Sequence, residues 1–159
     1  MLVAIDLVPV ELHHIKVVAE EMRECDRLEV FRAGGICAFE ALVRSVVESD
    51  VSKTVILNDR PVGVYGVVEH ACSGIATMAS PWCLGTDAGY SDLSNMLEMM
   101  TEVSNGWKHD YDVLWNKVDA QNEPAIEFLK RLDFTIFPPE NTGFFGDPFC
   151  LFQWRKGLN

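Results

Sequence analysis

The chain has 159 residues, enough for about one compact domain, and its 48% hydrophobic content can fill a single core. Its 24 acidic residues outnumber its 13 basic residues, which gives a formal net charge of -11. This charge repels phosphate backbones and anionic lipid, so we expect no nucleic acid and no membrane as partner, and it favours cationic or amine substrates and basic proteins.

The cysteines and histidines do not predict a disulfide framework or a metal site. The five cysteines are odd in number and widely spaced, and none forms a C-x-x-C pair, which predicts reduced thiols in a cytosolic protein. His13 and His14 are adjacent, so on a helix they point apart and cannot readily share a metal ion. Asp6 interrupts the N-terminal apolar run, which lacks a basic leader, and we expect neither a cleaved signal peptide nor a membrane span.

The first third of the chain predicts one strand followed by two helices. Residues 2–8 form a run of β-favouring residues. Apolar residues at helical spacing then continue from Leu12 to Met22, and we predict one long helix that ends before Gly34. A second helix is predicted over residues 38–47.

A hairpin and a further strand follow these helices. Two β-branched runs, at residues 53–57 and 62–68, flank the turn-rich tetrad Asn-Asp-Arg-Pro at residues 58–61. This pattern is typical of a β-hairpin. Residues 74–84 form the next predicted strand.

The second half of the chain predicts a helix and then a strand-helix-strand unit. We expect a helix over residues 91–107, capped by Ser91. Residues 111–118 are short and rich in β-favouring side chains, so they predict a strand. Asn122 then caps a second helix, and Pro124 stands where a missing amide hydrogen costs nothing.

The order of these elements predicts the fold class. The chain re-enters a strand at Phe134, and the second half of the aromatic segment 144–154 forms the last strand. We therefore predict an α+β fold that spans residues 1–159 as a single domain. Its sheet is mixed and mostly antiparallel, with about six to seven strands flanked by about four helices.

Several short motifs carry a resemblance to known proteins. The segment 111–118, Tyr-Asp-Val-Leu-Trp-Asn-Lys-Val, is followed by Asn122 and by a Phe-Leu-Lys triplet at residues 128–130. This pattern resembles the C-terminal half of the GCN5-related N-acetyltransferase (GNAT) superfamily. It is closer still to the small GNAT-like proteins of short-tailed bacteriophages, of the internal virion protein A type. The likeness extends to Arg23-x-x-Asp26-x-x-Glu29 and to Trp82-x-Leu84-Gly85-Thr86-Asp87.

The resemblance implies a phage-encoded protein with a site for acetyl-coenzyme A. In the GNAT family this cofactor lies between two parallel strands, which here end near Leu84 and Asp119, and its pyrophosphate meets main-chain amides of the turn after the first strand. The turn lacks the basic residue that leads the family motif, and it carries Asp87 where a phosphate would approach. A divergent cofactor cradle and a turn that has lost the cofactor are both compatible with this sequence. The implied cofactor-binding residues are Leu84, Gly85, Thr86, Gly89, Tyr90, Ser91 and Asn122.

The resemblance also implies a general acid. The family's acid is a tyrosine on the helix after Asn122, and the corresponding residue here is Leu129, which has no proton to donate. Tyr90 or Tyr111 could replace it only if folding brings its hydroxyl within hydrogen-bonding reach. Tyr90 is the candidate that we retain.

A general base is implied as well, and the sequence offers several carboxylates. Asp26, Glu29, Glu69 and Asp119 are the candidates, and we retain Glu29 and Asp119 as catalytic residues. Arg23, Asp26 and Glu29 are spaced by three residues and share one helix face. A structural cluster of ion pairs is therefore the alternative to a substrate site.

Two functions are compatible with these residues. The first is acetyl-coenzyme A-dependent N-acetyl transfer to an amine of a host protein or small molecule. The second is a catalytically silent protein that binds and modulates a host enzyme during infection, or serves in virion assembly with another phage protein. With either function, we expect the protein to be in the host bacterial cytoplasm or associated with the virion. Phe144, Phe145 and Trp154 would mark a partner surface if exposed, with core packing as the alternative, and the C-terminal strands could form a homodimer.

Overall fold

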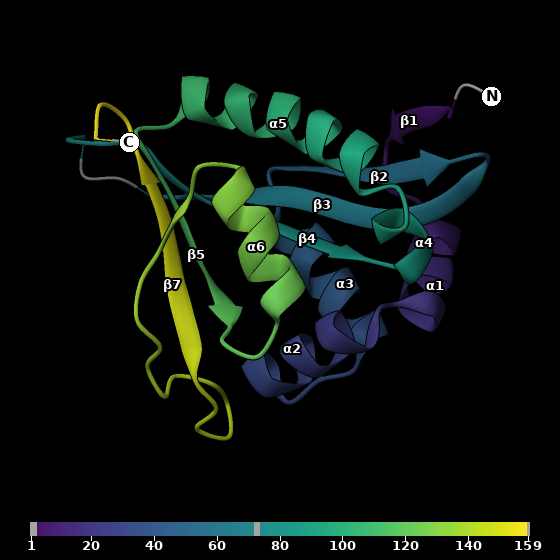
Figure 1. Ribbon diagram of the computed structural model, residues 1–159, viewed down its shortest axis with the longest axis horizontal. Coiled ribbons are helices and arrows are strands. Elements are labelled where there is room, and N and C mark those ends of the chain that lie inside the picture. The colour runs from purple at the N-terminus through teal and green to yellow at the C-terminus, as the bar shows by residue number, and fades with distance from the viewer. Residues whose placement is uncertain (1–2, 72–73, 159) are drawn as a thin grey trace.

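The computed structural model describes residues 3–71 and 74–158, which form one seven-stranded sheet with helices on both faces (Figure 1). Leu2 and Cys72 lie outside these residues. The strand order is β1-β2-β3-β4-β5-β7-β6, in which β4 and β5 are parallel and their neighbours are antiparallel. The α+β class and the mixed, mostly antiparallel sheet are thus confirmed. The strands are β1 (Ile5–Val8), β2 (Val51–Leu57), β3 (Arg60–His70), β4 (Met78–Gly85), β5 (Val113–Asp119), β6 (Thr135–Ile136) and β7 (Phe149–Arg155).

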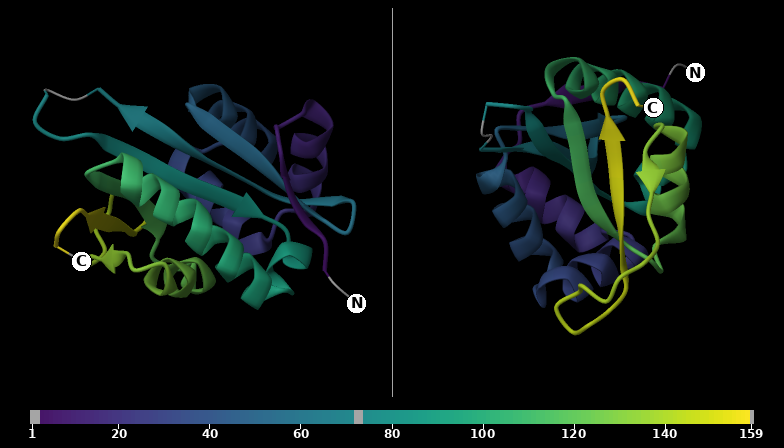
Figure 2. Two further views of the ribbon diagram at one scale, coloured as in Figure 1. Left: turned by 90° about the horizontal axis from the view of Figure 1, so that it is seen from above. Right: turned by 90° about the vertical axis from the view of Figure 1, so that its left-hand side faces the viewer.

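Helices cover both faces of the sheet (Figure 2). One face carries α1 (Leu12–Glu21), α2 (Glu24–Gly34) and α3 (Ala38–Glu48), and the other carries α5 (Leu93–Asp110) and α6 (Glu123–Arg131). The short α4 (Asp87–Tyr90) leads from β4 into α5. Met100, Leu114 and Phe152 belong to the larger core, under α5 and α6, and Val18 and Leu42 belong to a smaller core under α1 and α3. Within the described residues, no helix is long and apolar enough to cross a membrane.

The predicted hairpin is confirmed, with a tighter turn than the tetrad suggested. Asn58 and Asp59 have positive φ angles of 49° and 64°, and Leu57 pairs directly with Arg60. Two left-handed residues are what a two-residue hairpin turn requires, and Asn and Asp tolerate this conformation. Pro61 therefore lies inside β3, beside a register shift at which Val62 has no direct partner in β2, and such irregular positions tolerate a missing amide hydrogen.

The prediction of one long first helix was wrong. The chain leaves the helical conformation at Met22, which has a ψ of 136° and forms an isolated β-bridge with Thr86. The amide of Arg23 then donates to the carbonyl of Gly85 over 2.9 Å. The break exists because the end of β4 supplies hydrogen-bond partners, and such a contact overrides local helical periodicity. It divides the predicted helix into α1 and α2.

The helix expected to begin at Ser91 also begins differently. Thr86 caps α4, because its side-chain oxygen accepts from the amide of Gly89, and α5 starts after Asp92. The hydroxyl of Ser91 donates backward to the carbonyl of Ala88 over 2.7 Å. With α4 and the divided first helix, the described residues contain six helices where about four were expected.

The two parallel strands separate soon after they meet. β4 and β5 pair only at Met78 with Val113 and at Ala79 with Leu114. Farther along, the side-chain amide of Asn116 donates to the carbonyl of Pro81 over 3.1 Å, and beyond this contact the strands diverge, as Figure 1 shows. β5 remains paired with β7 along its whole length. A V-shaped gap therefore opens toward the carboxyl ends of β4 and β5.

Two glycine-to-alanine substitutions, one in the sheet and one in a helix, should change the free energy of unfolding in opposite directions. A Cβ atom at Gly66 would lie 2.8 Å from the carbonyl of Val51 and 2.9 Å from Trp82, whereas at the exposed helical Gly106 it would meet nothing within 4 Å. We expect Gly66→Ala to lower the free energy of unfolding by about 1–3 kcal/mol through overpacking. Gly106→Ala should raise it by about 0.5–1 kcal/mol because alanine favours the helix. Urea unfolding of both variants measures the difference, and an unchanged stability of Gly66→Ala would contradict the packing described.

Candidate functional site

The gap between β4 and β5 contains a cavity of about 260 Å³, here called the gap cavity. The two strands form its sides, α2 contributes Glu29 and Val30 from one face of the sheet, and α5 and α6 contribute Ser104 and Phe128 from the other. Most of its walls are apolar. Glu29 is the one carboxylate among the described residues that line it, so any proton transfer to a carboxylate inside this cavity would involve Glu29.

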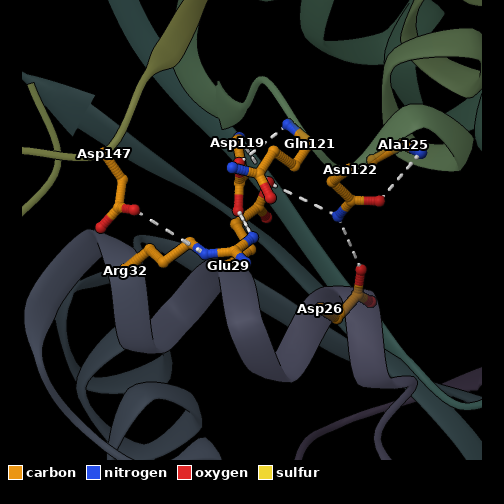
Figure 3. A network of polar contacts seen from close by, with 8 residues as sticks. All are labelled: Asp26, Glu29, Arg32, Asp119, Gln121, Asn122, Ala125 and Asp147. Atoms are coloured by element: carbon orange, nitrogen blue, oxygen red, sulfur yellow. Dashed lines mark hydrogen bonds and ion pairs between the residues drawn. The ribbon is translucent and has the colours of Figure 1, made fainter. Parts of the chain in front are cut away.

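A polar network joins α2 to the turn between β5 and α6, as Figure 3 shows. Asn122 lies at its centre. The side-chain amide of Asn122 donates to Asp26 Oδ1 over 3.1 Å and to Glu29 Oε1 over 3.5 Å, while its oxygen accepts from the amide of Ala125 over 3.3 Å. The predicted helix cap is thus confirmed, and Asn122 also binds two carboxylates of another helix.

Asp119, a predicted base, is fully buried and already engaged. Its Oδ2 accepts from Arg32 Nη1 over 2.8 Å, and its Oδ1 accepts from the amide of Gln121 over 2.9 Å. Its own amide donates to Glu29 Oε1 over 2.7 Å. Asp119 therefore holds Glu29 through its main chain and anchors α2 through Arg32, and its carboxylate does not line the gap cavity.

The carboxyl group of Glu29 has a strongly raised pKa. Burial is the main cause that raises its pKa from 4.5 to about 8, and the neighbouring charges of Asp26 and Asp119 raise it further. The hydrogen bonds from the Asp119 amide and Asn122 oppose this shift. A carboxyl group with a pKa near the working pH can act as a general base or acid, since it exchanges its proton readily there.

The structure brings Tyr90 to the gap cavity, together with Leu129. The Arg23 guanidinium lies 3.2 Å from the centroid of the Tyr90 ring, and the Phe128 ring lies 6.2 Å away. Burial raises the pKa of Tyr90 well above 10, so the phenol stays neutral and can donate a hydrogen bond. The other tyrosine considered, Tyr111, instead donates to Glu69 over 3.4 Å, outside this cavity.

The turn after β4 uses several of its amides inside the protein. The amide of Gly85 donates to Asp26 Oδ2 over 3.0 Å, that of Thr86 to the carbonyl of Val62 over 2.9 Å, and that of Gly89 to the Thr86 side chain over 3.3 Å. A Cβ atom at Gly89 would lie 3.0 Å from the Val62 carbonyl. Close packing against β3 therefore explains why this position holds a glycine, and no approach of a phosphate is needed to explain it.

The predicted site residues thus fall into two groups. Glu29, Leu84 and Tyr90 line the gap cavity, and Asn122 and Asp119 lie behind it in the polar network. The other predicted cofactor residues are Gly85, Thr86 and Gly89, which are buried in the turn, and the exposed Ser91. Sequence reasoning did not single out Arg32. Its place on the α2 face of Asp26 and Glu29 was a weak signal, but its partner Asp119 is 87 residues away.

Comparison with known proteins shows the fold. The sequence matches no protein-family model and no curated protein. Its structure is similar to that of the ribosomal-protein-S18-alanine N-acetyltransferase from Escherichia coli, with a TM-score of 0.65 and 11% identity over 99% of this chain and 96% of that chain.

Two further structures agree with this comparison. An acetyltransferase of the GNAT family from Streptococcus pneumoniae matches with a TM-score of 0.60 and 14% identity, over 98% of this chain and 99% of that chain. An aminoglycoside acetyltransferase in complex with coenzyme A matches with a TM-score of 0.61 and 14% identity, over 97% of this chain and 95% of that chain. At such low identity the likeness is one of fold, and the predicted GNAT-like fold is confirmed.

The raised pKa of Glu29 predicts a pH-dependent stability. Between its ordinary pKa of 4.5 and the folded value of about 8, the folded protein binds more protons than the unfolded chain. The free energy of unfolding should therefore fall as the pH rises through this interval. Glu29→Gln removes the titrating group and should flatten the decline. Urea unfolding of both proteins across this range measures it, and parallel pH profiles would contradict the assignment.

The two roles of Asn122 can be separated by a matched pair of substitutions. Asn122→Ser keeps a side-chain oxygen for the helix cap and loses the amide donor, whereas Asn122→Ala loses both. We expect Asn122→Ser to cost about 1–3 kcal/mol of stability because buried carboxylates lose a donor. Asn122→Ala should cost about 1 kcal/mol more, from the cap. Chemical unfolding gives both values, and a serine variant as stable as the wild type would show that the amide donor contributes nothing.

Proposed function

We propose that this chain is an acyltransferase that binds acetyl-coenzyme A at the gap and transfers acetyl to an amine. The observation that carries the proposal is the gap cavity itself, since it lies between two parallel strands that pair at only two positions and has Glu29 in its wall. The GNAT fold of the chain and the coenzyme A in a similar aminoglycoside acetyltransferase support the choice of cofactor.

The residues present fit this cofactor in part. The apolar walls of the gap cavity suit a thin pantetheine arm. The amides of Gly85, Thr86 and Gly89 are engaged elsewhere, so the pyrophosphate would be received by the amides of Asp87 and Ala88 in α4 or by the first turn of α5, where helix geometry leaves amides without intrahelical partners. Asp92, the residue before this turn, opposes an anion there.

The side chains at the gap cavity could divide the proton transfers between them. The bound cofactor would supply a thioester-activated acetyl group. Glu29, in its ionised form, would take a proton from the acceptor ammonium, so that the amine nitrogen can form the new bond to the acetyl carbon as the carbon–sulfur bond breaks. The departing sulfur would leave as a thiolate that accepts a hydrogen bond from the Tyr90 hydroxyl, and it would take up the second proton that the amine nitrogen loses as the amide forms. Asn122 and the amide of Asp119 would hold Glu29 in position.

The acceptor that we propose is an amine of a host protein or of a small molecule. The formal charge of -11 supports a cationic acceptor. The sequence resemblance to phage proteins supports a role in an infected bacterium, in the host cytoplasm or in the virion.

A second function is favoured by the turn after β4. Its engaged amides, together with Leu129 in the place of the family's tyrosine, suit a protein that keeps the fold and no longer uses the cofactor. Such a protein would bind a host enzyme or a phage protein without catalysis.

Calorimetric titration with acetyl-coenzyme A, with coenzyme A alone for comparison, distinguishes the two functions. Ala125→Trp on α6 places an indole in the cavity wall and should abolish binding, because the ring occupies the gap. Glu127→Trp on the exposed side of the same helix is its matched control and should bind as the wild type does. Glu29→Gln should keep the cofactor and lose about a hundredfold or more in acetyl transfer to an amine.

Two results would overturn the acyltransferase proposal. Absence of saturable binding by the wild type at millimolar cofactor would leave the catalytically silent function. Equal affinity of Ala125→Trp and Glu127→Trp would show that the gap is not where the cofactor binds.

A further inference from the structure

Three phenylalanine rings gather at the C-terminal end of α2 and are exposed to solvent. Phe144 and Phe145 lie in the segment between β6 and β7 and are 66% and 59% exposed, and Phe31 of α2 is 50% exposed. The rings of Phe144 and Phe145 are 4.8 Å apart, and those of Phe31 and Phe145 are 5.2 Å apart. We call these three residues the aromatic tip. Contiguous exposed aromatic rings of this kind typically mark an interaction surface.

The main chain holds the aromatic tip in place. The amide of Phe144 donates to the carbonyl of Arg32 over 2.8 Å, and the amide of Gly143 donates to the carbonyl of Asp147 over 2.9 Å. Gly35 ends α2 with a φ of 67°, and a Cβ atom there would lie 3.1 Å from the Phe144 ring. The lack of a side chain thus allows both the left-handed conformation and the close approach of the ring. The main chain that carries Phe144 is thus held against α2 before any partner arrives, which lowers the entropy cost of binding.

The electrostatic surroundings of the aromatic tip favour a cation. Residues 137–148 include Glu140 and Asp147 and contain no lysine or arginine. Arg32 pairs with Asp119 and also faces Asp147 at 4.0 Å. Arg27, one turn before Phe31 on α2, donates to the main-chain carbonyls of Ala19 and Glu20. The negative end of the α2 dipole points to the same place. Phenylalanine faces themselves attract ammonium and guanidinium groups.

We propose that the aromatic tip is a docking surface for a basic protein segment, in which lysine or arginine residues flank one large apolar side chain. The apolar side chain rests on the three rings, and the basic residues meet the acidic surroundings. A second copy of this chain suits the surface poorly, because two proteins with a formal charge of -11 repel each other. The surface lies outside the gap cavity, so this proposal does not depend on acetyl transfer.

Fluorescence anisotropy with a labelled synthetic peptide tests the docking surface. The peptide carries one tryptophan flanked by lysines, and two comparison peptides replace the lysines by glutamates or the tryptophan by alanine. The double variant Phe144→Ala, Phe145→Ala should weaken binding of the first peptide by at least about tenfold, as expected for aromatic anchors. Val47→Ala, which removes an exposed apolar side chain from α3, is the matched control and should bind as the wild type does.

Each remaining outcome decides the proposal. Weaker binding of both comparison peptides, and loss of affinity at high salt, would support a basic segment with an apolar anchor. Three results would overturn it: no saturable binding by the wild type, equal binding of the glutamate peptide, or equal binding by the double variant.

Sedimentation velocity of the wild type and the double variant tests the other occupant. A wild type that is dimeric and a double variant that is monomeric would make the occupant a second copy of this chain and would overturn the proposal as well. Circular dichroism confirms that the variants are folded.

Discussion

The early separation of β4 and β5 is the constraint on which the rest of the site depends. A strand that leaves its neighbour loses hydrogen-bond partners, and buried amides cannot remain without them. Two such amides, of Gly85 at the end of β4 and of Asp119 at the end of β5, donate to Asp26 and Glu29 of α2. The carboxylates of α2 therefore replace the missing ladder between the strands, and the gap stays open because α2 bonds to both sides of it.

This arrangement brings the carboxylates of Asp26, Glu29 and Asp119 close together, and only two of the three have an arginine as ion-pair partner. Arg23 pairs with Asp26 over 2.9 Å, and Arg32 pairs with Asp119 over 2.8 Å. No ion pair of Glu29 occurs within the described residues, and its pKa rises to about 8 as burial favours the neutral form. The network that provides hydrogen-bond partners for the buried amides thus also contains one carboxyl group, that of Glu29, with a pKa near neutral pH. The structural cluster that the sequence offered as one alternative is present, and it leaves Glu29 available for the chemistry proposed above.

The turn after β4 shows the opposite balance between structure and chemistry. Its glycine at 89 fits closely against Val62, and the amides of Gly85, Thr86 and Gly89 stabilise the ends of β4 and α4. An anion-binding turn needs amides that point outward. Stability at this turn and binding of a pyrophosphate therefore compete for the same donors.

Local chemistry in the sequence was sufficient for several elements. Asn122 with Pro124 determined where α6 begins, and the Asn58-Asp59 pair determined a hairpin, because a cap or a left-handed turn depends on neighbours in the chain. Contacts between distant segments decided the rest. The break at Met22 needs the end of β4, and the ion pair of Arg32 with Asp119 joins residues 87 positions apart. That pairing leaves Glu29 as the carboxylate that lines the gap cavity and Asp119 as the one paired with an arginine behind it. No periodicity or spacing along the chain encodes this difference, because burial and partner charges arise only when the helices pack on the sheet.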